Sequence, residues 1–201
     1  MKKVFLAMFF LGLSFWASGQ KVTVPKLPTT VDEFIELRDK IAQTPEGGAT
    51  IMIIALITYA QNPELGLPFL TIAIEKDQLT DGKGGYKDKV PSKAAMSMIE
   101  SQIGKDSKKS YTPNSYIQGT SPDNGYKLPS NNLILEFNTN SSSGDPKSGT
   151  FKLFVKSSGA DSPRPITVKS NDKGVWKAKE WSSLLVGVRP PAVKGTDTDD
   201  F

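Results

Sequence analysis

The sequence predicts an α+β domain in which N-terminal helices pack on a C-terminal antiparallel sheet. Two observations support this fold class. The spacing of apolar residues changes from helical to alternating near residue 132. Short segments rich in Gly, Pro, Ser, Asn and Asp separate the alternating segments, as hairpin connections do. Because sequential strands with short turns form a meander, we expect the helices to cover one face of a curved sheet of about four strands.

The first two helices are predicted from their start signals. Thr30 and Glu33 have the spacing of a capping box, and apolar residues then recur at helical spacing up to Gln43. Thr44 is a preferred N-cap residue, and the proline after it suits the first helical position. Residues 51–60 are apolar on nearly all sides, so the second helix must be buried.

Two further helices are expected before the sheet. Asn62 and Pro63 should end the second helix, and a third is predicted over Phe69–Lys76, although its apolar residues also alternate as in a strand. A fourth begins at Ser92 and ends at Gly104. The side chains of this last helix that should face inward are Ala95, Met96, Ile99 and Ile103.

Four strands follow, each with apolar residues on one face. The sets that share a face are Leu133, Leu135 and Phe137; Phe151, Leu153 and Val155; Ile166 and Val168; and Trp176 with Ala178. Simple alternation along the last strand places Trp176 in the core. It places Trp181 on the opposite, accessible side.

The N-terminus resembles a secretory leader. Lys2 and Lys3 precede an apolar run over 4–16, and the small residues 17–19 suit signal peptidase, so residues 1–19 are predicted as a signal peptide and Gln20 as the mature N-terminus. The run is shorter than the roughly 20 residues of a membrane span. We therefore expect an exported protein, periplasmic or extracellular, with no membrane contact after cleavage.

The remaining chain is expected to form one domain. Residues 20–29 should be an extended segment, residues 30–188 a single α+β domain, and residues 189–201, with two prolines and several acidic residues, a disordered tail. Removing the leader takes two from the 25 basic residues, against 21 acidic ones, so the net charge is only about +2. No run of like charge marks a nucleic-acid site, and we expect no nucleic-acid partner. The oligomeric state is not predictable.

The chain contains no histidine and no cysteine. That composition excludes Ser-His-Asp and Cys-His nucleophiles, disulfides, and zinc or copper sites of the usual ligand types. Ser170 and Lys173 match the S-x-x-K spacing of a serine–lysine pair, but they fall in an apparent turn and chance explains them better. Glu136 and Glu180 could serve as paired carboxylates, but solvated strand residues explain them better. We predict no catalytic residue and no cofactor.

A glycine-rich segment over 76–90 could bind a metal ion. Asp77, Asp81 and Asp88 lie in it, but the alternation of an EF-hand loop is absent and lysines interleave. Its glycines also lack the strand-before, helix-after setting of a phosphate loop. We therefore expect a mobile connection and no metal site.

The long segment over 105–131 is the best candidate for a binding loop. Its length indicates either a binding loop or a helix or strand that the pattern does not reveal. It contains three tyrosines, which could bind a ligand, although anchoring the loop to the core explains them better. Two of the three arginines lie beside prolines, which suits either recognition of an anionic group or an ion pair with Asp123 or Asp161. The candidate ligand-binding residues are Tyr116, Asn124, Tyr126, Arg164, Trp181 and Arg189.

Several segments resemble an uncharacterised family of secreted bacterial proteins, a domain of unknown function. They are Ser115–Tyr126, Ser158–Ile166, Val175–Trp176, Glu180–Leu184 and Val188–Pro191, and the resemblance covers residues 30–191 approximately. This family implies a single domain and no catalytic residue. The order of helices and then sheet, with Gly174–Lys177 as the closing strand, also resembles the nuclear transport factor 2-like superfamily at the level of the fold.

These observations favour a secreted or periplasmic, non-catalytic binding domain. Its partner would be an unknown polar ligand, a glycan or a protein, bound near the tyrosine-rich loop. The alternative is a hydrolase of the cell envelope that uses carboxylates or a Ser-Lys pair. A deep pocket with a buried carboxylate or a lysine of shifted pKa would favour the enzyme, and an exposed aromatic patch would favour binding.

Overall fold

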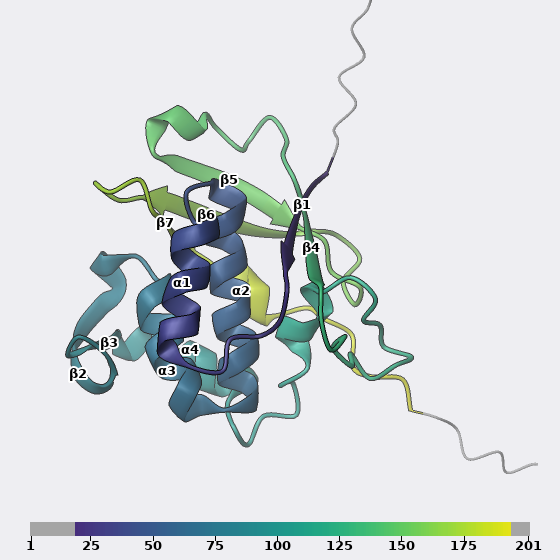
Figure 1. The fold of residues 1–201 in the computed structure, drawn as a ribbon. Coiled ribbons are helices and arrows are strands. Elements are labelled where there is room, and N and C mark those ends of the chain that lie inside the picture. Colours follow the sequence, from purple (N-terminus) through teal and green to yellow (C-terminus); the bar gives the residue numbers. More distant parts are fainter. Residues whose placement is uncertain (1–18, 194–201) are drawn as a thin grey trace, which may run out of the picture.

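The computed structural model describes residues 19–193 and confirms the α+β class. Four helices pack against a five-stranded antiparallel sheet, and a separate two-stranded hairpin lies beside the helices (Figure 1). The predicted signal peptide lies almost wholly outside the described residues, as does the chain beyond residue 193. No helix within residues 19–193 is long and apolar enough to cross a membrane.

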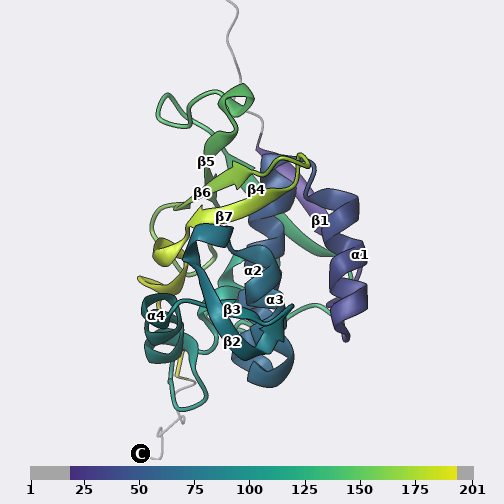
Figure 2. The ribbon, with the colours of Figure 1, turned by 90° about the vertical axis from the view of Figure 1, so that its left-hand side faces the viewer.

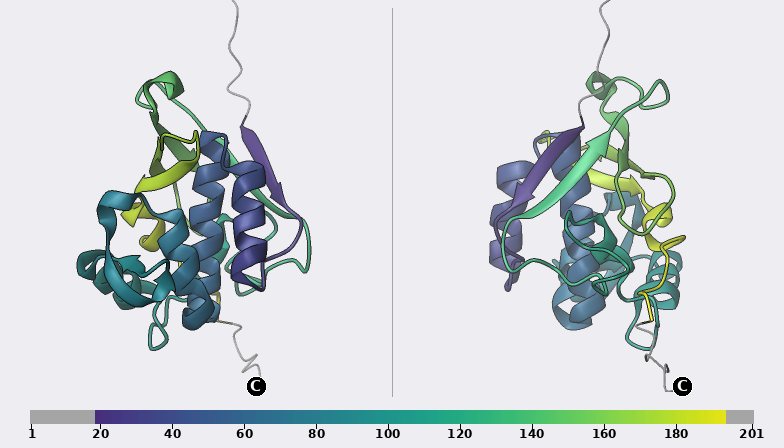
Figure 3. Two further views of the ribbon diagram at one scale, coloured as in Figure 1. Left: turned by 60° about the vertical axis from the view of Figure 1, so that its left-hand side comes forward. Right: turned by 90° about the vertical axis from the view of Figure 1, so that its right-hand side faces the viewer.

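The sheet has the order β1-β4-β5-β6-β7. The four predicted strands are β4 (Leu133–Asn138), β5 (Thr150–Val155), β6 (Arg164–Ser170) and β7 (Trp176–Glu180). The fifth, β1 (Gln20–Val24), comes from the predicted extended segment and pairs with β4 at one edge, where the two run side by side (Figure 3).

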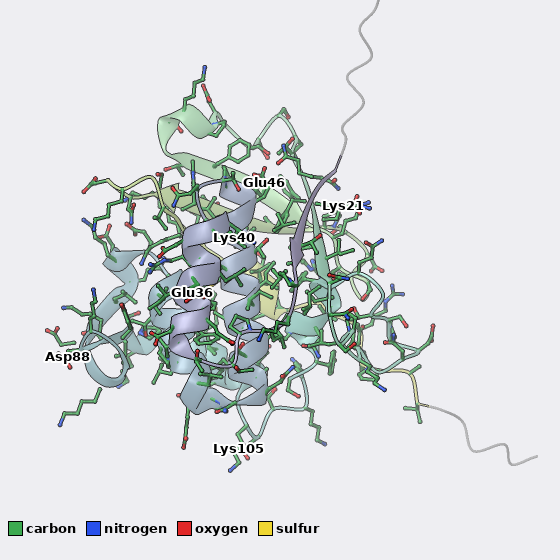
Figure 4. The ribbon with its side chains drawn as sticks, viewed as in Figure 1. Lys21, Glu36, Lys40, Glu46, Asp88 and Lys105 are labelled. Carbon is green, nitrogen blue, oxygen red and sulfur yellow. The ribbon has the colours of Figure 1, made fainter. Side chains whose placement is uncertain are left out.

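The helices are α1 (Val31–Ile41), α2 (Pro45–Gln61), α3 (Pro63–Ala73) and α4 (Lys93–Ile103). Helix α2 is buried on nearly all sides, as its composition predicts, because it packs between α1, α3 and the strands β6 and β7. Figure 2 shows β7 crossing in front of it. On α1, Glu36 and Lys40 lie one turn apart on the outward face (Figure 4).

The predicted helix caps are present. The hydroxyl of Thr44 accepts a hydrogen bond from the Gly47 backbone N–H at 3.1 Å, and that of Thr30 accepts one from Glu33 at 3.2 Å. The capping box of α1 is shifted by one residue, because the Glu33 carboxylate accepts from the Thr29 backbone N–H at 2.7 Å. This contact, a bond from the Thr29 hydroxyl and a lysine partner lower the pKa of Glu33 to about 2.

The third helix begins earlier than its sequence suggests. Asn62 ends α2 and also caps α3, since its side chain accepts a hydrogen bond from the Leu65 backbone N–H at 3.2 Å. Pro63 therefore occupies a first helical position and starts a helix as well as ending one. Helix α3 ends at Ala73, and Ile74 is extended and bridges to Ala178 of β7.

The segment predicted as a mobile connection is a β-hairpin. Strands β2 (Leu79–Tyr86) and β3 (Lys89–Pro91) pair antiparallel and pack on α3. Lys87 and Asp88 form the tight turn with φ angles of 51° and 54°, and Asp88 projects from it into solvent (Figure 4). The sequence conceals these strands because glycines and charges interrupt the alternation.

The prediction that Trp181 is accessible is wrong, because β7 contains a bulge. Ala178 pairs with Val168 but Glu180 pairs with Thr167, so Lys179 is an extra residue without a partner. A bulge shifts the alternation of side chains by one position. Trp181 therefore turns inward and is 5% exposed, and Trp176 is 8% exposed as predicted for a core residue.

The outer edge of β7 is covered by chain from the helical half. The Ala42 carbonyl accepts from the Trp176 backbone N–H at 2.8 Å, and the Glu75 N–H donates to the Ala178 carbonyl at 2.9 Å. The Gln78 side chain donates to the Lys179 carbonyl at 2.6 Å. These bonds protect the edge from other strands and place Glu75 next to the outer part of β7.

Candidate functional site

Two of the three tyrosines of the 105–131 segment, Tyr116 and Tyr126, are buried. Tyr116, at the end of a short 3-10 helix, is 2% exposed and donates its hydroxyl to the Leu184 carbonyl at 2.8 Å. Tyr126 is fully buried, stacks on Tyr111, and donates its hydroxyl to the Arg189 carbonyl at 2.7 Å. Burial raises the pKa of both buried hydroxyls. Tyr116 and Tyr126 therefore anchor the loop to the core, which is one of the two roles predicted for them.

The other predicted ligand residues also bind the protein itself. Arg164 donates from Nη2 to the Gly187 carbonyl at 2.5 Å. The Asn124 side chain stabilises its own turn, with Nδ2 donating to the Gly119 carbonyl at 2.9 Å. Trp181 donates from Nε1 to the Gln78 side chain at 3.2 Å.

Arg189 holds the start of the C-terminal segment. Its backbone N–H donates to the Gly159 carbonyl at 2.8 Å, and its guanidinium lies 3.7 Å from the Asp161 carboxylate at an exposed position. The Ala192 N–H then donates to the Pro122 carbonyl at 3.0 Å. Ordered backbone contacts therefore continue past residue 189, where the tail was predicted to begin.

The contacts described above join three segments of the chain, residues 111–126, 157–164 and 181–192, and we call these joined segments the clamp. Gly159 lies so close to the Tyr126 hydroxyl that any Cβ there would collide with it. Tyr126 itself has a φ of 57°, a left-handed conformation that its buried ring and hydrogen bond hold in place. The structure thus brings Tyr116, Tyr126, Arg164 and Arg189 into one region, where both tyrosine hydroxyls and Nη2 of Arg164 donate to backbone carbonyls.

A different cluster of charged side chains surrounds a pocket beside β7. The pocket has a volume of about 330 Å³ and lies between the β6–β7 turn and the chain that follows α3. We call it the lysine pocket. Its lining residues are Glu75, Lys76, Lys169, Ser170, Asn171, Asp172, Lys173 and Lys177.

Glu75 and Lys169 form an ion pair in this pocket. Glu75 is 7% exposed, and the Lys169 Nζ lies 3.0 Å from its Oε1. The hydrogen bond and the charge of Glu75 raise the pKa of Lys169. The same ammonium lies 3.9 Å from the Asp77 carboxylate, so Lys169 already has two acidic neighbours.

Lys177 has the opposite environment. It is half-buried, and within residues 19–193 its ammonium makes neither a hydrogen bond nor an ion pair. Its pKa is lowered below the ordinary value of 10.5, first by burial and then by the positive charge of Arg38, while Glu75 opposes the shift. The pocket therefore contains a half-buried cation that forms no ion pair with any residue the structure describes.

The alternative catalytic groups are not assembled. Ser170 and Lys173 both line the lysine pocket, but the Ser170 hydroxyl donates to the Asn171 carbonyl at 3.3 Å. Glu136 is paired with Lys156, and Glu180 accepts a hydrogen bond from Thr167. Glu136 and Glu180 lie on β4 and β7, three strand spacings or about 14 Å apart in the sheet, which exceeds the separation of glycosidase carboxylates.

The aspartates of 76–90 do not converge on a metal site. Asp81 forms a surface ion pair with Lys89 at 2.6 Å, and Asp88 lies at the turn of the hairpin. Across residues 19–193 no group of three or more acidic side chains could hold a metal ion.

The family comparison agrees with the extent of this fold. A family model described as a domain of unknown function (DUF6935) matches residues 26–192. The chain belongs to this family. Neither curated proteins nor solved structures gave a match to the chain.

Sequence reasoning missed the lysine pocket. Lys177 lies between Trp176 and Ala178 on a predicted strand, and Glu75 lies about 100 residues earlier, in a segment of ambiguous pattern. The available signal in the sequence is that Lys177 alternates with the apolar residues Trp176 and Ala178. That pattern by itself indicates only a solvated strand face.

Proposed function

We propose that this chain is an exported, non-catalytic binding domain and that the lysine pocket is its ligand site. The observation that supports this site is that the half-buried Lys177 lines the pocket and that its ammonium forms no ion pair within the described residues. A buried charged side chain whose role is only structural normally has a partner of opposite charge within the fold, as Lys169 has in Glu75.

Export is supported by the sequence of residues 1–19, with its basic start, apolar run and small residues before Gln20. Intact mass spectrometry of the secreted protein checks this part of the proposal. A mature chain beginning at Gln20 is expected, and a mass that retains the leader would contradict it. The likeness to nuclear transport factor 2-like folds stays a prediction, supported by the order of helices and sheet.

Ligand binding can be tested by a thermal-shift screen of residues 20–201 against glycans, cell-wall fragments, peptides and small organic acids. A ligand of the native state raises the melting temperature. We expect at least one class to do so, with the shift lost in Lys177→Met. The matched control is Lys179→Met, which makes the same change on the same strand at an exposed position outside the pocket. Equal loss in both variants would contradict the assignment of the site.

The hydrolase is the second candidate, because the pocket holds a buried carboxylate and a lysine of lowered pKa, the features expected of an enzyme, and Ser170 also lines it. It ranks behind binding because the Ser170 hydroxyl donates to the Asn171 carbonyl and, among the described residues, makes no hydrogen bond to a lysine. Ester and peptide hydrolysis by wild type and Ser170→Ala distinguishes the two functions. Turnover that Ser170→Ala abolishes would replace the binding proposal with an enzyme.

A further inference from the structure

We propose that the lysine pocket binds a compact oxyanion, the carboxylate or phosphate group of a small molecule, with Lys177 as its main charged contact. This inference rests on the binding function proposed above and specifies the chemistry of the ligand.

The charges that line the pocket are unbalanced in favour of an anion. Four lysines and two acidic residues line it. Glu75 is already paired with Lys169, which leaves Asp172 as the remaining acidic lining residue. Lys76, Lys173 and Lys177 therefore line the pocket with one exposed acidic residue among them.

The β6–β7 turn adds an uncharged donor. The Asn171 Oδ1 accepts hydrogen bonds from the Lys173 and Val175 backbone N–H groups, at 2.9 and 3.0 Å. These two bonds fix the amide, so its NH₂ group is free to donate to a ligand oxygen. A lysine ammonium acts as a point charge toward phosphate or carboxylate, and a fixed amide adds direction to that attraction.

The volume of the pocket and the partial burial of Lys177 both favour a small anionic ligand. A volume of about 330 Å³ is at the lower end of the range for small-molecule pockets and too small for several sugar or peptide units. Lys177 has already lost much of its hydration within the fold, so an oxyanion meets it at a low further desolvation cost.

Binding should be linked to proton uptake. The charged groups that shift the pKa of Lys177 are Arg38 from α1 and Glu75 after α3. The other charged residues that line the pocket with it are Lys76, Lys169, Asp172 and Lys173. In the free protein burial and Arg38 lower the Lys177 pKa, and a bound anion would raise it again. Affinity should therefore fall as pH rises from the lowered pKa toward 10.5.

Isothermal titration of residues 20–201 with inorganic phosphate and with citrate, at constant ionic strength with chloride as background, tests the proposal. We expect saturable binding of at least one probe, and the stronger probe identifies a phosphate or a carboxylate ligand. Lys177→Met should weaken binding by about tenfold or more, and Lys173→Glu, at the exposed rim, should weaken it by several-fold. Lys179→Met should change the affinity less than twofold.

The outcomes separate this proposal from the broader one. If phosphate and citrate fail to bind but a neutral glycan or peptide gives a Lys177-dependent thermal shift, the oxyanion assignment is overturned and the binding function stands. If no compound in either experiment binds, both proposals fail. If Lys177→Met and Lys179→Met weaken oxyanion binding equally, the binding is general attraction to a basic surface and the site is overturned.

Discussion

The clamp and the lysine pocket use polar side chains in different ways. In the clamp the hydroxyls of Tyr116 and Tyr126 and the guanidinium of Arg164 all donate to backbone carbonyls of the 181–192 segment. In the lysine pocket the backbone is satisfied within β7 and its neighbours, and the Lys177 ammonium is left without a partner among the described residues.

This difference shows that the residues most distinctive in the sequence have structural roles, while ordinary lysines form the candidate binding site. A tyrosine-rich loop with arginines beside prolines suggests recognition, yet the side chains of Tyr116, Tyr126, Arg164 and Arg189 each donate a hydrogen bond to a backbone carbonyl. The lysines of the pocket are common residues in an ordinary pattern, and their arrangement is what makes them candidates for binding. Perturbing both regions should therefore give opposite results for stability and ligand binding.

The largest expected effect is at the end of β7. Trp181→Ala should cost about 3–5 kcal/mol of unfolding free energy, as much as Trp176→Ala, because both rings are buried and the bulge at Lys179 turns Trp181 inward. Chemical denaturation of the two variants measures this. A Trp181→Ala protein close to wild type in stability would show that the ring is accessible and the bulge is absent.

Tyr126→Ala should cost nearly as much, about 3 kcal/mol, and Tyr126→Phe about 1–2 kcal/mol, since the latter keeps the ring but leaves the Arg189 carbonyl without its donor. Urea denaturation of both variants provides the measurement. Stability within 1 kcal/mol of wild type for both, with ligand binding lost, would return the clamp to the status of a ligand site.

A smaller loss is expected for Gly159→Ala, about 1–3 kcal/mol, because the added methyl would collide with the Tyr126 hydroxyl and Val188. Melting temperatures of this variant alone and combined with Tyr126→Phe test the contact. Removing the hydroxyl should relieve part of the loss, and strictly additive losses would contradict a direct collision.

The smallest effect on stability, and of opposite sign, is expected for Lys177→Met. The folded pKa of Lys177 is lowered, so the unfolded chain binds the proton more tightly between that pKa and 10.5, and the wild-type stability rises with pH in this window. Removing the charge should stabilise the protein near neutral pH by on the order of 1 kcal/mol or less, with the gain vanishing as pH approaches the unfolded value. A loss of stability at neutral pH would indicate that Lys177 has a structural partner.

The sequence by itself determined the fold class and most of the elements. Thr44 with its following proline, the apolar residues of α2 and the alternation of β4, β5 and β6 each act over a few residues, where local propensity and burial suffice. Tyr116, Tyr126, Arg164 and Arg189 were also singled out from the sequence, although as candidate ligand-binding residues.

Only the tertiary structure decided what those residues do. The bulge at Lys179 reverses the side of Trp181, and no local pattern predicts an unpaired residue. The pocket requires Glu75 and Lys177 to meet across about 100 residues of sequence, through backbone pairing between Glu75 and Ala178. Burial and the lowered pKa of Lys177 arise from that packing, because the dielectric environment of a charge depends on neighbours that are distant in the chain.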